Sequence, residues 1–333
     1  MQLFIRTVRI FAIGHLLLAG SAHLTRSSSR PLCVTLSNRA SFMDGADTKA
    51  DLDIVELFDF DANLLHEDFV GRVDSIVHNA NEHGIFYFGV PGTTLQTSRE
   101  SLSLSASSRF PSSMFIATCG VHPYHAESDP FVQVDLLSLA SSTYCLAIGE
   151  CGLDYTESFP VRDIQLPCFE KQVVIARKLQ KPLYLHVRAA HDDFVYILKK
   201  HGYDGENNPT ALAVHCFTGS SAELQEYVAL GCYIGLTGYV INKLNEAELK
   251  GFLSIIPPDK LLIETDAPYM GFPGCLANFE TDKKKKIKQK YPNVPSALPF
   301  VLDVVSSAAG VEVLEMARVT TRNAKRFFRL ETS

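Results

Sequence analysis

The chain has 333 residues, of which 46% are hydrophobic, and its formal net charge is −6. This length and apolar content suffice for one large core, so an α/β barrel needs no second domain. An acidic chain lacks the broad basic surface with which some proteins coat DNA regardless of sequence. No apolar run approaches the roughly 18 residues of a membrane span.

The first 43 residues differ from the rest in charge. They contain five Arg and no Asp or Glu, which leaves a net charge of −11 on residues 44–333. An Arg-rich, Ser-rich and acid-poor start is typical of a transit peptide for a mitochondrion or plastid. A basic start, a short apolar stretch and small residues at 20–22 are typical of a secretory signal, and initiation at Met43 would give a cytoplasmic form. We favour a transit segment and exclude residues 1–43 from the predicted fold.

From residue 55 onward, short apolar runs alternate with longer amphipathic segments. The apolar runs predict strands at 55–60, 85–90, 114–120, 144–149, 182–186, 211–215, 232–236 and 260–264. The other segments predict helices at 66–83, 94–108, 129–141, 162–180, 189–201, 220–230, 245–254, 295–309 and 312–328. This alternation implies a parallel sheet, and eight units predict a single (β/α)₈ TIM barrel over residues 55–330 with an extra C-terminal helix. An open, doubly wound sheet is the alternative fold.

Five of the apolar runs end in residues that can bind a metal ion or move a proton. In chain order these are Asp59, followed by Asp61 and Asn63, then Glu150, His186, His215, and Glu264 followed by Asp266. Barrel enzymes place their chemistry at the carboxyl ends of the strands. One such residue is weak evidence, but five along one chain predict a shared site at one end of a ring of strands.

These residues form a ligand set of nitrogen and oxygen atoms without Cys. Such a set suits Mg²⁺, Mn²⁺ or Zn²⁺, and we expect Mg²⁺. Two metal ions about 3.5–4 Å apart are a common solution for phosphoester hydrolysis. We predict that Glu150 bridges two ions and that His186 and His215 each bind through one imidazole nitrogen. Asp266 would complete a metal's ligand set or accept a proton from water.

Two further features are candidates for contact with a substrate. His122 lies in the motif GVHP at the end of the third predicted strand. We predict that it contacts a substrate phosphate rather than a metal ion. A Lys-rich stretch at 283–290, which includes Lys284, follows the eighth predicted strand. It is either a phosphate-contacting rim above the site or a solvated basic turn.

Seven motifs in the chain carry a resemblance to a known family. They are FDFDANL at 58–64, GVHP at 120–123, IGECGLD at 148–154, LHVR at 185–188, VHCFTG at 214–219, GLTG at 235–238 and LIETDAP at 262–268. Together they resemble the TatD-related deoxyribonuclease family of metal-dependent hydrolases. The resemblance spans roughly residues 57–328 without large gaps.

The resemblance implies a TIM barrel with two divalent metal ions that hydrolyses phosphodiester bonds in DNA. It further implies a 3′–5′ exonuclease that acts on single strands. The implied metal ligands are Glu150, His186, His215 and Asp266, and we predict that Glu150 and Asp266 are the catalytic residues. Arg188 matches a position beside the site, and we predict that it contacts the substrate.

The chain departs from the family pattern in two places. Many relatives carry H-x-H on the first strand, where this chain has Asp61 and Asn63. We expect Asp61 to bind metal and Asn63 to contact the substrate. Because Asn is a weaker metal ligand than His, a weaker second metal site is expected. The family's frequent Asn-Glu-Pro after the last strand reads Asn293-Val-Pro here, so one acidic contact is missing.

Two other functions remain as alternatives. One is a barrel enzyme of the amidohydrolase type, which would hydrolyse C–N bonds. The absence of H-x-H and of a Lys at the end of the fourth strand argues against it. The other is a barrel that has lost its activity, against which the retained ligands Glu150, His186, His215 and Asp266 argue.

Overall fold

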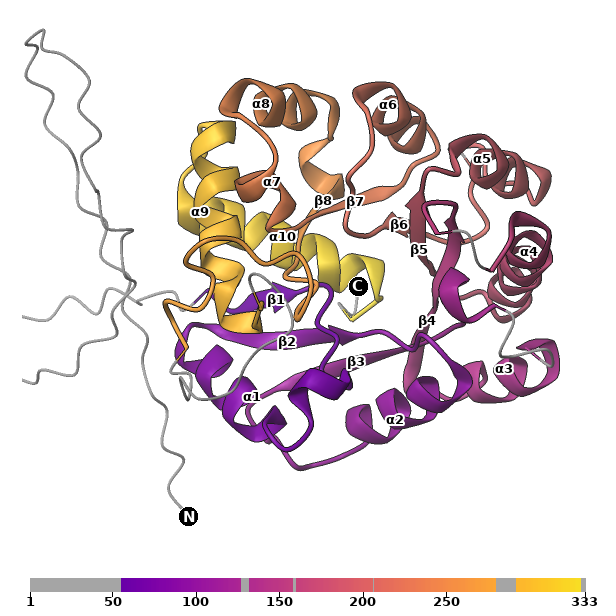
Figure 1. The fold of residues 1–333 in the computed structure, drawn as a ribbon, viewed down its shortest axis with the longest axis horizontal. Helices are drawn as coiled ribbons and strands as arrows, with labels where there is room; N and C mark the ends of the chain where they lie inside the picture. The colour runs from indigo at the N-terminus through magenta and orange to yellow at the C-terminus, as the bar shows by residue number, and fades with distance from the viewer. Residues whose placement is uncertain (1–54, 127–131, 158–159, 206, 280–291, 331–333) are drawn as a thin grey trace, which may run out of the picture.

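The computed structural model describes residues 55–126, 132–157, 160–205, 207–279 and 292–330. In this part of the chain, parallel strands pair in sequence order: β1 Leu57–Asp59, β2 Ile85–Val90, β3 Met114–Cys119, β4 Cys145–Asp154, β5 Leu183–Arg188, β6 Leu212–Val214, β7 Tyr233–Leu236 and β8 Leu261–Ile263. Hydrogen bonds from Phe60 N to Ile263 O (3.3 Å) and from Asp266 N to Asp61 O (2.9 Å) join the last strand to the first. The predicted TIM barrel is therefore confirmed, and the open sheet is wrong (Figure 1).

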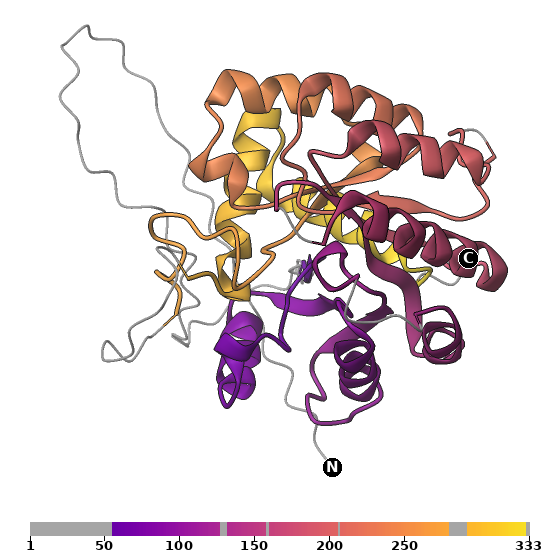
Figure 2. The ribbon, with the colours of Figure 1, turned by 45° about the vertical axis from the view of Figure 1, so that its right-hand side comes forward.

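Helices surround the ring of strands (Figures 1 and 2). The α-helices are α1 Val73–Glu82, α2 Leu95–Ser105, α3 Val132–Ala140, α4 Arg162–Leu179, α5 His191–Lys200, α6 Ser221–Ala229, α7 Tyr239–Asn242, α8 Glu246–Ile255, α9 Leu298–Ala309 and α10 Val313–Phe327. Short 3₁₀ helices are η1 Glu67–Phe69, η2 Pro123–His125, η3 Pro258–Lys260 and η4 Pro295–Ala297. The first predicted helix begins later than expected because Gly71 adopts a left-handed φ of +75°. The sequence pattern gave no indication of α7.

β4 is longer than predicted and carries two acidic residues on the strand itself. Gly149 and Gly152 have φ values of +142° and +150°. A Cβ atom at Gly149 would lie 2.0 Å from Tyr184 O, and one at Gly152 would lie 1.8 Å from His186 O. Only glycine permits β5 to approach this closely. The strand therefore continues past residue 149, and Glu150 lies on β4.

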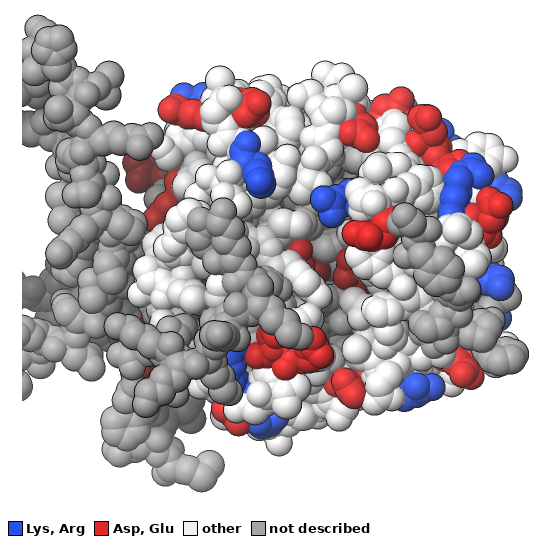
Figure 3. All heavy atoms as spheres, viewed as in Figure 1, with Lys and Arg blue, Asp and Glu red and all other residues white. Residues whose placement is uncertain are grey.

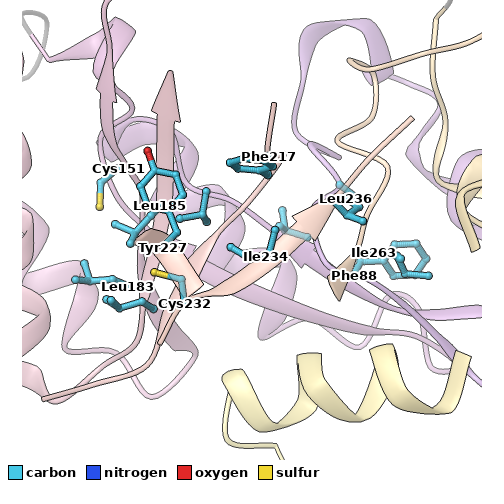
Figure 4. Packing of buried hydrophobic residues seen from close by; sticks show 14 of the residues in the cluster. Phe88, Cys151, Leu183, Leu185, Phe217, Tyr227, Cys232, Ile234, Leu236 and Ile263 are labelled. Atoms are coloured by element: carbon cyan, nitrogen blue, oxygen red, sulfur yellow. The ribbon is translucent and has the colours of Figure 1, made fainter. Parts of the chain in front are cut away.

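The outer face of the sheet packs against the helices and forms the larger core. Leu183 and Leu185 of β5 and Ile234 and Leu236 of β7 point to this side, where Figure 4 shows them near other apolar side chains. Burying each such side chain stabilises the fold by roughly 1.5–3 kcal/mol relative to exposure. The period-2 spacing of these residues places the intervening positions inside the barrel.

An aromatic cluster fills one end of the barrel interior. We call it the aromatic floor; it consists of Phe58, Phe60, Tyr184, Phe327 and Phe328. The ring centroids of Phe60 and Tyr184 are 5.0 Å apart, and those of Phe60 and Phe327 are 5.3 Å apart. Because Phe60 directly precedes Asp61 and Tyr184 lies two residues before His186, the floor lies one layer deeper than Asp61 and His186. α10 supplies Phe327 and packs against β1 and β8, which confirms the predicted extra C-terminal helix.

Two sequence predictions lie outside the described residues, namely the targeting segment 1–43 and Lys284. Among the residues that the structure does describe, no single helix is both long and apolar enough to cross a membrane. The pair Pro295–Ala309 and Val313–Phe327 reaches that length and composition only together, and it is bent by 110°.

Candidate metal centre

Three imidazoles converge on the carboxylate of Glu150, which is 5% exposed. Its Oε1 atom lies 3.3 Å from His122 Nε2, 3.1 Å from His186 Nδ1 and 2.8 Å from His215 Nε2. Burial alone would raise the pKa of Glu150, but His215, His122 and His186 together hold this pKa well below its usual range. The carboxylate is therefore ionised and ready to bind a cation.

The potential ligand atoms fall into two groups, each with its atoms within 4.8 Å of one another. The first ligand group is His122, Glu150 and His186, and the second ligand group is Asp61, His215 and Asp266. Glu150 belongs to the first group and its Oε1 also contacts His215 of the second. One carboxylate thus touches both groups.

Asn63 links the two aspartates of the second ligand group. Its Nδ2 atom donates to Asp61 Oδ1 at 3.1 Å and to Asp266 Oδ1 at 3.0 Å. On the other side, Asp61 Oδ2 lies 3.3 Å from His215 Nδ1. Asn63, which we predicted to contact substrate, therefore also serves to hold the two carboxylates in place.

The residues present fit divalent cations. His215 Nδ1 is buried and has no hydrogen-bond partner among the described residues. Burial, with repulsion from Glu150 next in size, raises the pKa of Asp266 to about 7, and burial also raises the pKa of Asp61 well above its usual range. A cation in the second ligand group would bind this nitrogen, which makes no hydrogen bond to Asp61 or Glu264, and would offset the cost of burying the two carboxylates.

The acidic surface around the site would also require bound cations to accept a phosphate group. Figure 3 shows Asp and Glu atoms recessed in a hollow near the middle of one face. The acidic side chains in this hollow would repel a phosphate group unless bound cations reversed the sign of the local electrostatic potential.

Asp154 acts on the first ligand group through His186. Asp154 Oδ2 lies 2.9 Å from His186 Nε2 and accepts a hydrogen bond of 2.9 Å from Tyr124 OH. Burial would lower the pKa of His186, but hydrogen bonds to Asp154 and Glu150 raise it to about 9. A carboxylate on the far nitrogen fixes the orientation of a metal-binding imidazole. Asp154 itself lies on β4.

Two predicted strand-end acids accept hydrogen bonds from the segments below the ligand groups. Asp59 accepts hydrogen bonds from Thr265 N at 2.7 Å and from Thr265 Oγ1 at 2.6 Å. Glu264 accepts a hydrogen bond from Cys216 N, and its Oε1 is 3.8 Å from His215 Nδ1. These contacts fix the segments that carry Asp266 and His215.

The structure brings together most residues that the sequence singled out. Those in or between the two ligand groups are Glu150, His186, His215, Asp266, Asp61, Asn63 and His122. His122, predicted as a phosphate contact, lies among potential metal ligands instead. Arg188 ends β5 with an exposed side chain, as a substrate contact requires.

Two tyrosines near the site were missed by the sequence reasoning. Tyr184 OH donates to Asp61 Oδ2 at 2.6 Å, and Tyr124 OH donates to Asp154. Residues two apart on a strand face the same side, so Tyr184 could have been placed beside His186 on β5. Tyr124 lies in a loop and had no such signal.

The comparisons with known proteins agree with this geometry. The sequence profile described as "TatD related DNase" matches residues 58–329. The chain is 35% identical over 275 residues to the 3′-5′ ssDNA/RNA exonuclease TatD of Erwinia amylovora, covering 82% of this chain and 100% of that protein. It is 34% identical over 273 residues to the protein of the same name from Salmonella typhimurium, covering 82% and 98%.

Solved structures show the same fold. YJJV, a TatD homolog from Escherichia coli K12, superposes with a TM-score of 0.70 at 25% identity, covering 84% of this chain and 100% of that one. A TatD family hydrolase from Entamoeba histolytica gives a TM-score of 0.70 at 24% identity, covering 82% and 98%. At 24% identity, the similarity to the Entamoeba histolytica protein supports the fold alone.

Proposed function

The chain belongs to the TatD related DNase family, and on that premise we propose that it is a metal-dependent 3′–5′ exonuclease acting on single-stranded DNA. The observation that carries this proposal is the convergence of both ligand groups on Glu150 at the carboxyl ends of the barrel strands. The names of the relatives at 34–35% identity support this substrate class. The same names disfavour the two alternatives, an amidohydrolase-type enzyme and a barrel that has lost its activity.

We propose two bound metal ions, with Mg²⁺ as the expected species and Mn²⁺ or Zn²⁺ as alternatives. His122, Glu150 and His186 would hold one ion, while Asp61, His215 and Asp266 would hold the other. Such ions acidify water and stabilise charge on the attacking and leaving oxygens of the phosphodiester. Glu150 would serve both groups, and the support is that its Oε1 contacts residues of each.

The chain's own side chains have three further roles in this proposal. Asp266 completes the second ligand group and accepts a proton from the attacking water. Asn63 holds Asp266 and Asp61 in one arrangement. Arg188 and Lys284 contact substrate phosphates, and such cationic side chains add affinity that depends on salt.

We also propose that residues 1–43 direct the protein to an organelle. The support is their composition, which is rich in Arg and Ser and free of acid. This proposal is independent of the proposed chemistry, because the segment precedes every strand of the barrel.

The test of the proposed activity is a polarity assay with a 5′-labelled single-stranded DNA oligonucleotide and Mg²⁺. We expect a ladder of products shortened one nucleotide at a time from the 3′ end. The same oligonucleotide with a phosphorothioate at its 3′-terminal linkage should resist the first cut, whereas one at the 5′-terminal linkage should not. RNA of the same sequence serves as the comparison substrate. Internal cuts, or digestion from the 5′ end, would contradict the proposed polarity.

A further inference from the structure

Tyr184 is the member of the aromatic floor that contacts the second ligand group. Its side chain is fully buried on β5. Its hydroxyl donates to Asp61 Oδ2 at 2.6 Å, and its ring stacks on His215 with centroids 5.4 Å apart and planes 27° apart. Tyr184 therefore touches two of the three residues of that group.

The two oxygens of Asp61 have different hydrogen-bond donors. Oδ2 accepts from the Tyr184 hydroxyl, and Oδ1 accepts from Asn63 Nδ2 at 3.1 Å. Hydrogen bonds to a carboxylate are among the strong ones, and a donor on each oxygen fixes the plane of the group. Asp61 is thus held in one orientation before any cation binds.

The Tyr184 hydroxyl is itself held rigidly. The ring stacks on Phe60 with planes 16° apart, and it lies near Phe327 and Phe328 with centroids 6.5 Å and 6.4 Å away. These rings are part of the aromatic floor, to which α10 contributes Phe327. Close packing of this kind prevents the phenol from turning away from Asp61.

We propose that Tyr184 is a positioning residue for a divalent cation in the second ligand group. Its hydroxyl orients Asp61, its ring sets the plane of His215, and the other rings of the aromatic floor hold Tyr184 in place. The inference rests on the proposed function in one respect, since it takes this group to bind a metal ion. In this proposal Tyr184 does not bind the metal ion itself and affects metal binding only through Asp61 and His215.

The test is a calorimetric titration of metal-free protein with Mn²⁺, using Tyr184→Phe. This change removes the hydroxyl and leaves the ring in place. Loss of a residue that orients a ligand costs about 10–100-fold in metal affinity. We expect one of two Mn²⁺ sites to weaken by that factor and the other to remain unchanged. At saturating Mn²⁺ the variant should regain most of its kcat, with KM for DNA unchanged.

Tyr203→Phe is the matched control. Tyr203 is also fully buried, and its hydroxyl shares a hydrogen bond of 2.9 Å with Thr210 Oγ1, a residue of neither ligand group. This control should leave both Mn²⁺ affinities unchanged. If Tyr203→Phe weakens Mn²⁺ binding as much as Tyr184→Phe does, the effect is a general one of deleting a buried hydroxyl, and the proposal is wrong.

A double-variant cycle tests the route through Asp61. In an Asp61→Ala background, Tyr184→Phe should cause no further loss of Mn²⁺ affinity. An additional loss of tenfold or more there, or equal affinities in wild type and Tyr184→Phe, overturns the proposal while leaving the nuclease assignment intact. A wild-type protein that binds one Mn²⁺ also overturns it. If wild type binds no Mn²⁺ at all, the proposed metal-dependent function fails as well.

Discussion

Glu150→Gln should lower kcat by at least about two orders of magnitude, which corresponds to roughly 2.7 kcal/mol in activation free energy. Gln has nearly the shape of Glu but carries no negative charge. Oε1 of Glu150 is the atom on which His122, His186 and His215 converge, so this charge affects both ligand groups. Without it, metal binding weakens and the attacking water is less acidic. The fold should survive, because the barrel core does not depend on this strand-end acid.

The comparison variant is Asp154→Asn, which lies on the same strand. Asp154 contacts His186 and Tyr124 and belongs to neither ligand group, so its loss should reduce kcat less. Steady-state kinetics on single-stranded DNA, with thermal melting of both variants, measures the difference. If Glu150→Gln keeps near wild-type kcat while Asp154→Asn is inactive, the essential carboxylate has been assigned to the wrong position on β4.

Phe327→Ala should lower the free energy of unfolding by about 3–5 kcal/mol, the usual cost of truncating a buried Phe. Phe327 is fully buried, and its ring centroid lies 4.9 Å from that of Phe328, 5.3 Å from Phe60 and 5.7 Å from Tyr233. The neighbouring rings belong to barrel strands and to the end of the chain, so they can close the cavity only in part. The cost therefore includes lost burial and a residual void.

Urea denaturation measures this change, provided that wild type and variant unfold with the same dependence on urea. The control is Tyr196→Ala on α5, an aromatic truncation at a side chain that is 64% exposed. Surface changes of this kind usually alter stability by no more than about 0.5 kcal/mol. A loss below about 1 kcal/mol for Phe327→Ala would mean that α10 does not close the barrel as the structure has it.

The barrel and much of the candidate site could be predicted from the sequence because both depend on local patterns. Apolar runs that end in Glu150, His186 and His215 indicate strands whose carboxyl ends meet at one edge. In a parallel barrel those ends form one ring, so residues far apart in the chain must converge. The structure shows this convergence in the three imidazole contacts of Glu150.

The remaining features depend on contacts between strands. The extension of β4 follows from the close approach of Gly149 to Tyr184 and of Gly152 to His186, which no single segment reveals. The position of His122 among potential ligands depends on how the loop after β3 folds over the site. These are tertiary effects that override a local strand or turn prediction.

The first-strand residues are the most informative departure from the family pattern. Their identities predicted a weaker second metal site, because Asn is a poorer ligand than His. In the structure Asn63 instead donates to Asp61 and Asp266, and Tyr184 donates to Asp61. The second ligand group therefore consists of His215 and two carboxylates that are held by hydrogen bonds, whereas many relatives carry two histidines on the first strand.

Removal and restoration of metal is the most direct test of a metal-dependent nuclease at this site. The enzyme is treated with chelator and dialysed, and release of the 3′-terminal nucleotide from labelled single-stranded DNA is then measured with and without added Mg²⁺ or Mn²⁺. We expect no hydrolysis in the metal-free enzyme and full recovery on addition of either ion. Undiminished hydrolysis in excess chelator would contradict the metal centre and the mechanism proposed for it.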